Sequence, residues 1–196
     1  SFLRCRRRPQ SPSWQKTRAS TCNTPDVSVV NRSRILDLDL APEGHRSIEW
    51  ARRHSPLVDE FLRERLKDGA LVGRRVAVVV HLEAKTALLA TVLADAGAHV
   101  VAAGSNPHST RDEIAAALVE RGVEVHSTRD SGYDAWEKDL LAVADTDPEF
   151  IIDDGAELTI RMARQRPSKF EALKGVTEQT TTGVARLVEL ANRGRL

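Results

Sequence analysis

Short continuous runs of apolar residues alternate along this chain with stretches in which apolar residues recur every three to four positions. The runs at residues 75–80, 100–103, 123–126 and 150–153 are rich in β-branched residues and predict buried strands, with a fifth at 174–177. Strands of this kind are covered on both faces, because a strand with one wet face would alternate apolar and polar residues.

The stretches between these runs predict amphipathic helices. Pro42 suits a first helical turn, and Ser55-Pro56 begins a second apolar stripe that ends at Gly69. Thr110 and Glu113 have the spacing of a capping box. Further helical faces are expected through residues 88–96, 114–119, 133–144, 157–164 and 182–192.

This alternation of strands and helices predicts a doubly wound, Rossmann-like α/β domain, a parallel sheet with helices on both faces. We expect it to occupy residues 31–196. Residues 1–30 carry six Lys and Arg residues and one acid, and show no apolar periodicity. We expect a disordered basic tail or translated sequence upstream of the true start; a transit peptide and a nucleic-acid-binding arm are the alternatives.

Composition narrows the function classes. The formal net charge is +1, and the basic tail accounts for the excess, so the domain itself is not expected to bind nucleic acid. Both cysteines, Cys5 and Cys22, lie in the tail, which leaves the domain without a disulfide or a CxxC zinc site and suits a reducing cytoplasm. No apolar run is long enough to span a bilayer, and no metal-binding spacing occurs, so neither membrane nor metal is expected.

Polar residues follow four of the five predicted strands. Ligands of open α/β sheets bind beyond the carboxyl ends of the strands, so these segments are expected to converge on one site. Each also has a purely structural interpretation, as a helix cap or a turn. The adjacent carboxylates Asp153 and Asp154 should repel, and one of them could then hold a raised pKa suited to proton transfer. The segments are 81–86, 105–110, 153–155 and 178–183.

Five motifs give the chain a family resemblance from about Asp37 onward: LDLAPEGHRSIEWA, VVHLEAKTALLATVLADAGAHV, GSNPHSTRDEIAAAL, FIIDDGAELT and GVTEQTTTGVARL. In this order and spacing they resemble S-adenosylhomocysteine hydrolase. The family implies a reversible, NAD-dependent hydrolysis of a nucleoside thioether to nucleoside and homocysteine by a cytoplasmic homo-oligomer, usually a tetramer.

The resemblance also implies roles for individual residues. His81 and Asp154 match the catalytic histidine and aspartate, and we expect their side chains to meet around a nucleoside. Gln179 falls at the position of a third catalytic residue. The cofactor-binding positions are Thr180, Thr181 and Thr182, which reach NAD held by another domain. The substrate-binding positions are Glu83, Lys85, Thr86, Asn106 and Ser109.

Four departures from the family pattern bear on activity. Glu83 replaces a threonine, and Arg111 replaces the glutamine of an STQD motif. Lys85 replaces Glu or Gln near the adenine; an ammonium group has no acceptor for an adenine amino group, which argues against adenine. Gln179 replaces a glutamate, and an amide cannot act as a base.

Neither GxGxxG nor a phosphate-binding P-loop occurs in the chain, so we expect the NAD-binding domain to be missing and these residues alone to be inactive. Two interpretations follow for the whole protein. It is a diverged thioether hydrolase, or it is a non-catalytic paralogue that serves as a ligand-binding or hetero-oligomer subunit. Comparing adenosine with inosine as ligands would test the argument from Lys85.

Overall fold

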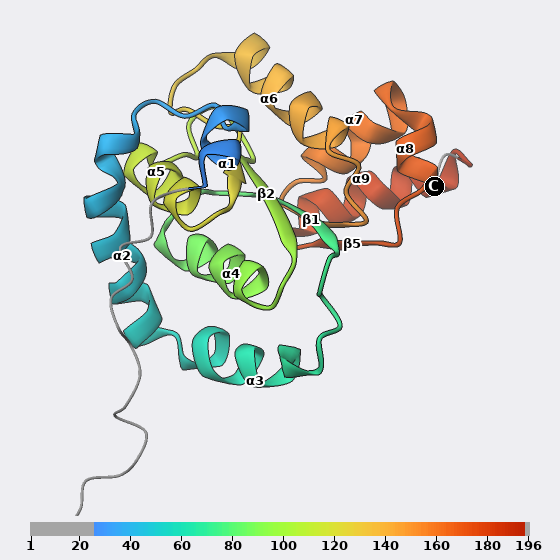
Figure 1. Cartoon of the computed structure of the whole chain (residues 1–196). Coiled ribbons are helices and arrows are strands. Elements are labelled where there is room, and N and C mark those ends of the chain that lie inside the picture. Colours follow the sequence, from blue (N-terminus) through green and yellow to red (C-terminus); the bar gives the residue numbers. More distant parts are fainter. Residues whose placement is uncertain (1–25, 195–196) are drawn as a thin grey trace, which may run out of the picture.

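A five-stranded parallel sheet forms the centre of the computed structural model, which describes residues 26–194 (Figure 1). The strand order is β3-β2-β1-β4-β5, so the chain reverses its direction of winding between β1 and β4. The predicted doubly wound fold is therefore confirmed. The strands are β1 Arg75–Val80, β2 His99–Gly104, β3 Glu124–Val125, β4 Phe150–Asp153 and β5 Gly175–Glu178.

Helices follow the strands much as the periodicity predicts. The main helices are α1 Val27–Arg32, α2 Ala41–His54, α4 Ala84–Asp95, α5 Asp112–Glu120, α6 Tyr133–Asp145, α7 Glu157–Gln165, α8 Pro167–Glu171 and α9 Thr181–Asn192. Further helical segments are η2 Leu38–Leu40, η3 Leu57–Leu62, α3 Arg63–Arg65 and η4 Leu66–Asp68. Within residues 26–194, no helix is long and apolar enough to cross a membrane.

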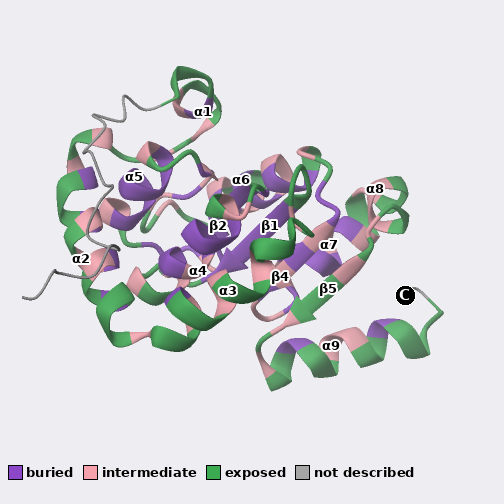
Figure 2. Cartoon of the chain, turned by 60° about the horizontal axis from the view of Figure 1, so that its bottom comes forward, coloured by how far each residue is buried: buried purple, intermediate pink, exposed green. Residues whose placement is uncertain are grey.

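The central strand β1 is buried on both faces, as its unbroken apolar run predicts (Figure 2). Val76, Val78 and Val80 pack in one core with residues of α2, α4 and α5. Ala77 and Val79 pack in a second core with residues of α6 and α7. Successive strand residues face opposite sides of the sheet, so one strand supplies both cores.

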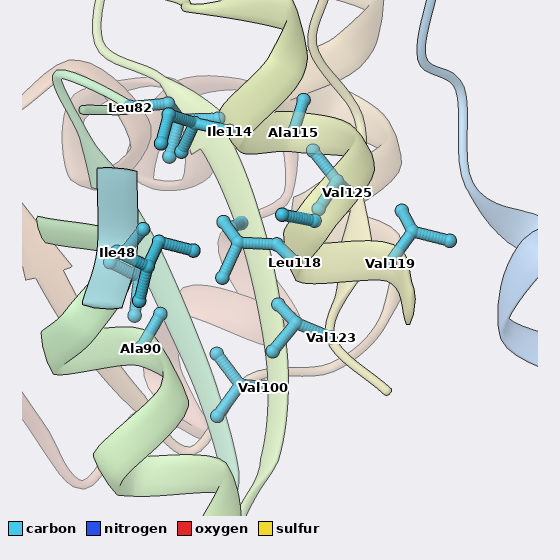
Figure 3. Packing of buried hydrophobic residues seen from close by; sticks show 14 of the residues in the cluster. Ile48, Leu82, Ala90, Val100, Ile114, Ala115, Leu118, Val119, Val123 and Val125 are labelled. Carbon is cyan, nitrogen blue, oxygen red and sulfur yellow. The ribbon is translucent and has the colours of Figure 1, made fainter. Parts of the chain in front are cut away.

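The helix α2 forms a further layer over α4 and α5. Ile48 is 1% exposed and lies in the core with Leu82, Ile114 and Leu118 (Figure 3). Gly44 permits the close approach, because a Cβ atom at this position would lie 1.8 Å from the backbone oxygen of Glu113. The packing places α2 beside the starts of α4 and α5, which border the carboxyl edge of the sheet.

Two local predictions are wrong. Thr110 does not cap α5: its side chain is buried and bonds to the hydroxyl of Ser127, and Arg111 is the N-cap residue. The domain also begins before residue 31, because α1 starts at Val27 and Val29 is buried in the core. The rest of the predicted tail, with both cysteines, lies in residues 1–25, outside the described residues.

Candidate functional site

The carboxyl ends of β1 and β4 place a histidine beside a carboxylate. His81 directly follows β1, and Asp154 directly follows β4. The His81 Nε2 atom lies 3.4 Å from the Asp154 Oδ2 atom. The two strands are neighbours where the winding of the sheet reverses, and such a switch point opens a crevice that binds ligands in α/β proteins. The expected meeting of these two side chains is therefore found in the structure.

The two groups differ in exposure. The side chain of His81 is 58% exposed and that of Asp154 is 13% exposed. Ser105 Oγ donates a hydrogen bond of 3.0 Å to Asp154 Oδ2 and so holds the carboxylate in place. Ser105 belongs to the predicted segment 105–110 but was not among the predicted site residues, although its place after β2 puts it at the same edge of the sheet.

Asp153 has a different role from its neighbour. Its carboxylate is fully buried and accepts hydrogen bonds from the backbone N–H of Asp154 and from the N–H and hydroxyl of Thr159, at 3.0, 2.9 and 2.7 Å. Burial raises the pKa of Asp153, although these hydrogen bonds act in the opposite direction. The raised pKa predicted for one member of the pair thus comes from burial rather than repulsion, and belongs to the residue that anchors α7.

The end of β5 repeats this arrangement. The Glu178 carboxylate accepts hydrogen bonds from the backbone N–H groups of Gly155, Ala156 and Thr180 at 3.0, 2.7 and 2.7 Å. Burial acts to raise the pKa of Glu178, but the hydrogen bonds outweigh it and hold the pKa below its usual range. A Cβ atom on residue 183 would lie 2.2 Å from this carboxyl group, which explains the glycine there. Glu178 therefore joins the β4 and β5 loops.

The residues after Glu178 border the same crevice. Gln179 is exposed, and its backbone N–H donates to the carbonyl oxygen of Asp153 at 3.1 Å. Thr180 caps α9 by accepting from the Gly183 N–H, and it also accepts from the Gly155 N–H at 3.2 Å. Thr181 and Thr182 are exposed in the first turn of α9. The threonine run thus lies next to the loop that carries Asp154.

Three predicted substrate-binding side chains form hydrogen bonds within their own turns. The Thr86 hydroxyl donates to the carbonyl oxygen of His81 and accepts from the Glu83 N–H at 3.1 Å. Asn106 Oδ1 accepts from the His108 N–H at 2.9 Å, and Ser109 Oγ donates to the Asn106 carbonyl at 2.9 Å. These contacts fix the loops that carry the exposed site residues.

Glu83 and Lys85 line a cavity of about 370 Å³ beside the crevice. Its other walls include Arg111 and three residues of α2, Arg46, Ser47 and Trp50. The indole of Trp50 is 58% exposed and stacks on the His54 ring at 4.3 Å. The sequence pattern did not predict this contribution of α2, because it depends on how a distant helix packs.

This sheet, with a histidine–carboxylate pair at its switch point, defines an α/β domain with a small-molecule site. The chain belongs to the S-adenosyl-L-homocysteine hydrolase family, whose model matches residues 32–168.

The chain is 41% identical over 164 residues to the S-inosyl-L-homocysteine hydrolase of Methanococcus maripaludis, covering 84% of this chain and 40% of the relative. It is 43% identical over 153 residues to the adenosylhomocysteinase of Thermotoga maritima, covering 78% of this chain and 38% of the relative. The chain therefore spans about 40% of the length of the curated relatives that it matches.

Proposed function

We propose that the natural protein carrying this chain catalyses the reversible, NAD-dependent reaction of an S-nucleosyl-L-homocysteine with water to give the nucleoside and homocysteine. This chain supplies the substrate-binding part. The pairing of His81 Nε2 with Asp154 Oδ2 at 3.4 Å carries the proposal, because it sets two proton-transferring groups at the ligand crevice of the sheet. The cytoplasmic location and the homotetramer implied by the family remain part of the proposal.

The two groups have complementary roles in this proposal. Imidazole both gives and takes protons near neutral pH, so exposed His81 would transfer a proton at the departing sulfur and at the water that replaces it. Asp154, held by Ser105, would orient the imidazole and take a proton from the sugar. In this proposal, the 5′ end of the ribose would lie beside the contact of the two side chains.

The first turn of α9 is suited to contact bound NAD. Thr181 and Thr182 present exposed hydroxyl groups there, and Gly183 leaves the turn without a further side chain. The backbone N–H groups at a helix start favour a polar or anionic ligand. Bound NAD would supply the acceptor and later the donor of a hydride, while these residues of the chain would position it.

Lys85 favours a base with an oxo group at position 6, such as hypoxanthine. The family resemblance implies that Lys85 lies near that edge of the base. There its ammonium group would donate to a carbonyl oxygen but could accept nothing from an amino group. Glu83 lines the same cavity and can accept from the N1–H of a 6-oxopurine. The relative from Methanococcus maripaludis, named for an inosyl substrate, supports this choice.

The test compares S-inosyl- and S-adenosyl-L-homocysteine as substrates of the natural protein with NAD. We expect a higher kcat/KM for the inosyl compound and a loss of that preference by about 10- to 100-fold in Lys85→Glu, the range for a hydrogen bond to a charged group. Lys138→Glu on α6 is the matched control, because Lys138 is exposed and lies outside the cavity lining. If the natural protein turns over neither thioether, the proposed reaction is wrong.

A second candidate is a non-catalytic, ligand-binding subunit. The chemistry at the end of β5 favours it. The exposed residue there is the amide Gln179, which cannot act as a base, and the adjacent Glu178 carboxylate already accepts hydrogen bonds from the backbone of the β4 loop. Binding of the thioether without turnover, in the presence of NAD, would select this candidate.

A further inference from the structure

Arg186 on α9 contacts the turn that carries Asp154. Its Nη1 atom donates hydrogen bonds to the carbonyl oxygen of Gly155 at 2.5 Å and to Glu157 Oε1 at 2.6 Å. Gly155 directly follows Asp154, so the first contact lies one residue away from the carboxylate that faces His81. The side chain of Arg186 is 37% exposed, and both contacts lie outside its own helix. Arg186 therefore connects the helix after β5 to the end of β4.

The turn after Asp154 has a backbone conformation that side chains rarely adopt. Gly155 and Ala156 have positive φ angles of 79° and 56°. This region is unfavourable for alanine, and such a residue persists only where surrounding contacts hold it. The Gly155 and Ala156 N–H groups donate to the Glu178 carboxylate at 3.0 and 2.7 Å, whereas the Gly155 carbonyl oxygen accepts from Arg186. Arg186 thus holds the carbonyl side of the turn, as Glu178 holds its N–H side.

Glu157, the second partner of Arg186, extends these contacts to the end of β2. Its Oε2 atom accepts from Arg161 Nη1 at 2.5 Å, and the Arg161 guanidinium lies 4.5 Å from the centre of the Trp136 ring. The Trp136 indole N–H donates to the carbonyl oxygen of Gly104 at 2.8 Å. The residue after Gly104 carries the hydroxyl that bonds to the carboxylate of the site. The contacts of Arg186 therefore reach both strand ends that hold this carboxylate.

We propose that Arg186 is a positioning residue, which holds Asp154 against His81 through the carbonyl group of Gly155. The assignment rests on the proposed function, in which Asp154 takes a proton from the sugar. The exposed threonines of the proposed NAD contact lie in the first turn of the same helix, so Arg186 ties the carboxylate to that turn. Without Arg186, the turn would be held mainly through its N–H groups, and the carboxylate would spend less time against the imidazole.

The alternative is a purely structural role for Arg186. The helix α9 packs on α7 through Leu190 and Ile160, and the contact of Arg186 with Glu157 would fasten the first turn of α7 to α9. The two roles differ in what the loss of Arg186 affects. Fastening of helices contributes to the free energy of unfolding, whereas positioning acts on the proton transfer that Asp154 performs.

The first measurement needs no ligand. Amide hydrogen exchange in the natural protein, followed by mass spectrometry on peptides covering residues 153–157, reports how often the turn opens. We expect exchange to be about tenfold faster or more in Arg186→Gln, as loss of a charged hydrogen bond implies. Arg186→Lys should recover most of the protection, because an ammonium group can donate to both partners of Nη1. Arg193→Gln is the matched control, since Arg193 lies just after α9 and contacts Glu189.

The second measurement separates hydride transfer from proton transfer in the natural protein with NAD. A ribose hydroxyl group that gives a hydride to NAD and its proton to solvent becomes a ketone, which acidifies the neighbouring C–H bond. Removal and return of that proton through Asp154 exchanges it for deuterium in deuterated water. The nucleosides are inosine and adenosine, and the same variants and control are used. NADH absorbance reports the hydride transfer, and deuterium in the recovered nucleoside reports the proton transfer.

We expect Arg186→Gln to lower deuterium exchange and thioether turnover by about 10- to 100-fold, while the rate of NADH formation stays within about threefold. If NADH formation and deuterium exchange fall equally, or neither falls, Arg186 does not position Asp154 and this inference alone fails. Unchanged amide exchange in Arg186→Gln would also overturn it. If the wild-type protein forms no NADH and turns over neither thioether, the proposed function fails, and the positioning role fails with it.

Discussion

The carboxyl ends of β4 and β5 present the same local design with different chemistry. Each ends in a neighbouring pair, Asp153-Asp154 on β4 and Glu178-Gln179 on β5. In each pair, the first carboxylate accepts hydrogen bonds from the backbone of the loops and holds the fold. The second residue of the pair at β4, Asp154, is a carboxylate in contact with His81, whereas the second residue of the pair at β5, Gln179, is an exposed amide.

The two residues of each pair have different roles, one structural and one chemical, although both pairs are composed of similar polar residues. Backbone N–H groups at the start of a helix or loop attract one carboxylate in each pair, and a carboxylate so engaged is a poor proton carrier. The next residue along a strand faces the other way and is available to a ligand. Chemistry at this edge therefore depends on the second residue of each pair.

The largest effect is expected at Asp154. Asp154→Asn should lower the turnover of the natural protein by about 10²- to 10⁴-fold, the usual contribution of a positioned acid or base. The amide keeps the shape of the side chain and its contact with Ser105, so the free energy of unfolding should change little. Steady-state kinetics and urea unfolding measure the two quantities. An active Asp154→Asn enzyme would remove Asp154 from the reaction.

Asp153 should show the opposite behaviour. Asp153→Ala leaves the buried N–H and hydroxyl of Thr159 without their acceptor and should lower the free energy of unfolding by about 3 kcal/mol. Asp154→Ala is the matched control, with an expected loss below about 1 kcal/mol in the same urea titration. Similar losses for both variants would contradict the division of roles at β4.

Gln179→Glu should make the end of β5 resemble the end of β4. A carboxylate at this exposed position can accept a proton, so we expect the turnover of the thioether to rise by about tenfold or more. Gln165→Glu at the end of α7 controls for the added charge. Unchanged turnover in Gln179→Glu would show that the amide is not what limits the reaction.

The smallest effect concerns the response of stability to acid. Because the folded protein holds the pKa of Glu178 below its usual range, the stabilisation is present above the unfolded-state pKa of about 4.3 and is lost as the pH falls through the folded-state pKa. Glu178→Gln should therefore be less stable near neutral pH and lose less stability on acidification. Urea unfolding from about pH 6 to 3 measures this difference. If the free energy of unfolding of Glu178→Gln changes with pH as steeply as that of the wild type, this account of Glu178 is wrong. Glu171→Gln on α8 serves as the control.

The sequence predicts the sheet well because a short, continuous run of β-branched apolar residues suits few structures other than a buried strand. The run at 75–80 coincides with β1, and the weaker run at 174–177 is displaced by one residue from β5. The convergence of the segments 81–86 and 153–155 also follows from the predicted fold, because ligand-binding loops lie at the carboxyl ends of the strands. The pairing of His81 with Asp154 was expected from the family resemblance.

Tertiary contacts account for what the sequence does not predict. Thr110 has the pattern of a cap but bonds to Ser127, seventeen residues away. The helix α1 has a single buried residue, Val29, and so shows little periodicity. Trp50 lines the cavity that contains Lys85 because α2 packs over the start of α4. Each depends on segments that are distant in the chain.

The most direct test is a crystal structure of the natural protein with S-inosyl-L-homocysteine bound. We expect the carbon–sulfur bond at the 5′ position to lie within hydrogen-bond reach of His81, about 3 Å directly or through one water, with Asp154 on the sugar side of the imidazole. A nucleoside bound on the opposite edge of the sheet, with its ribose away from both side chains, would contradict the assignment of this site.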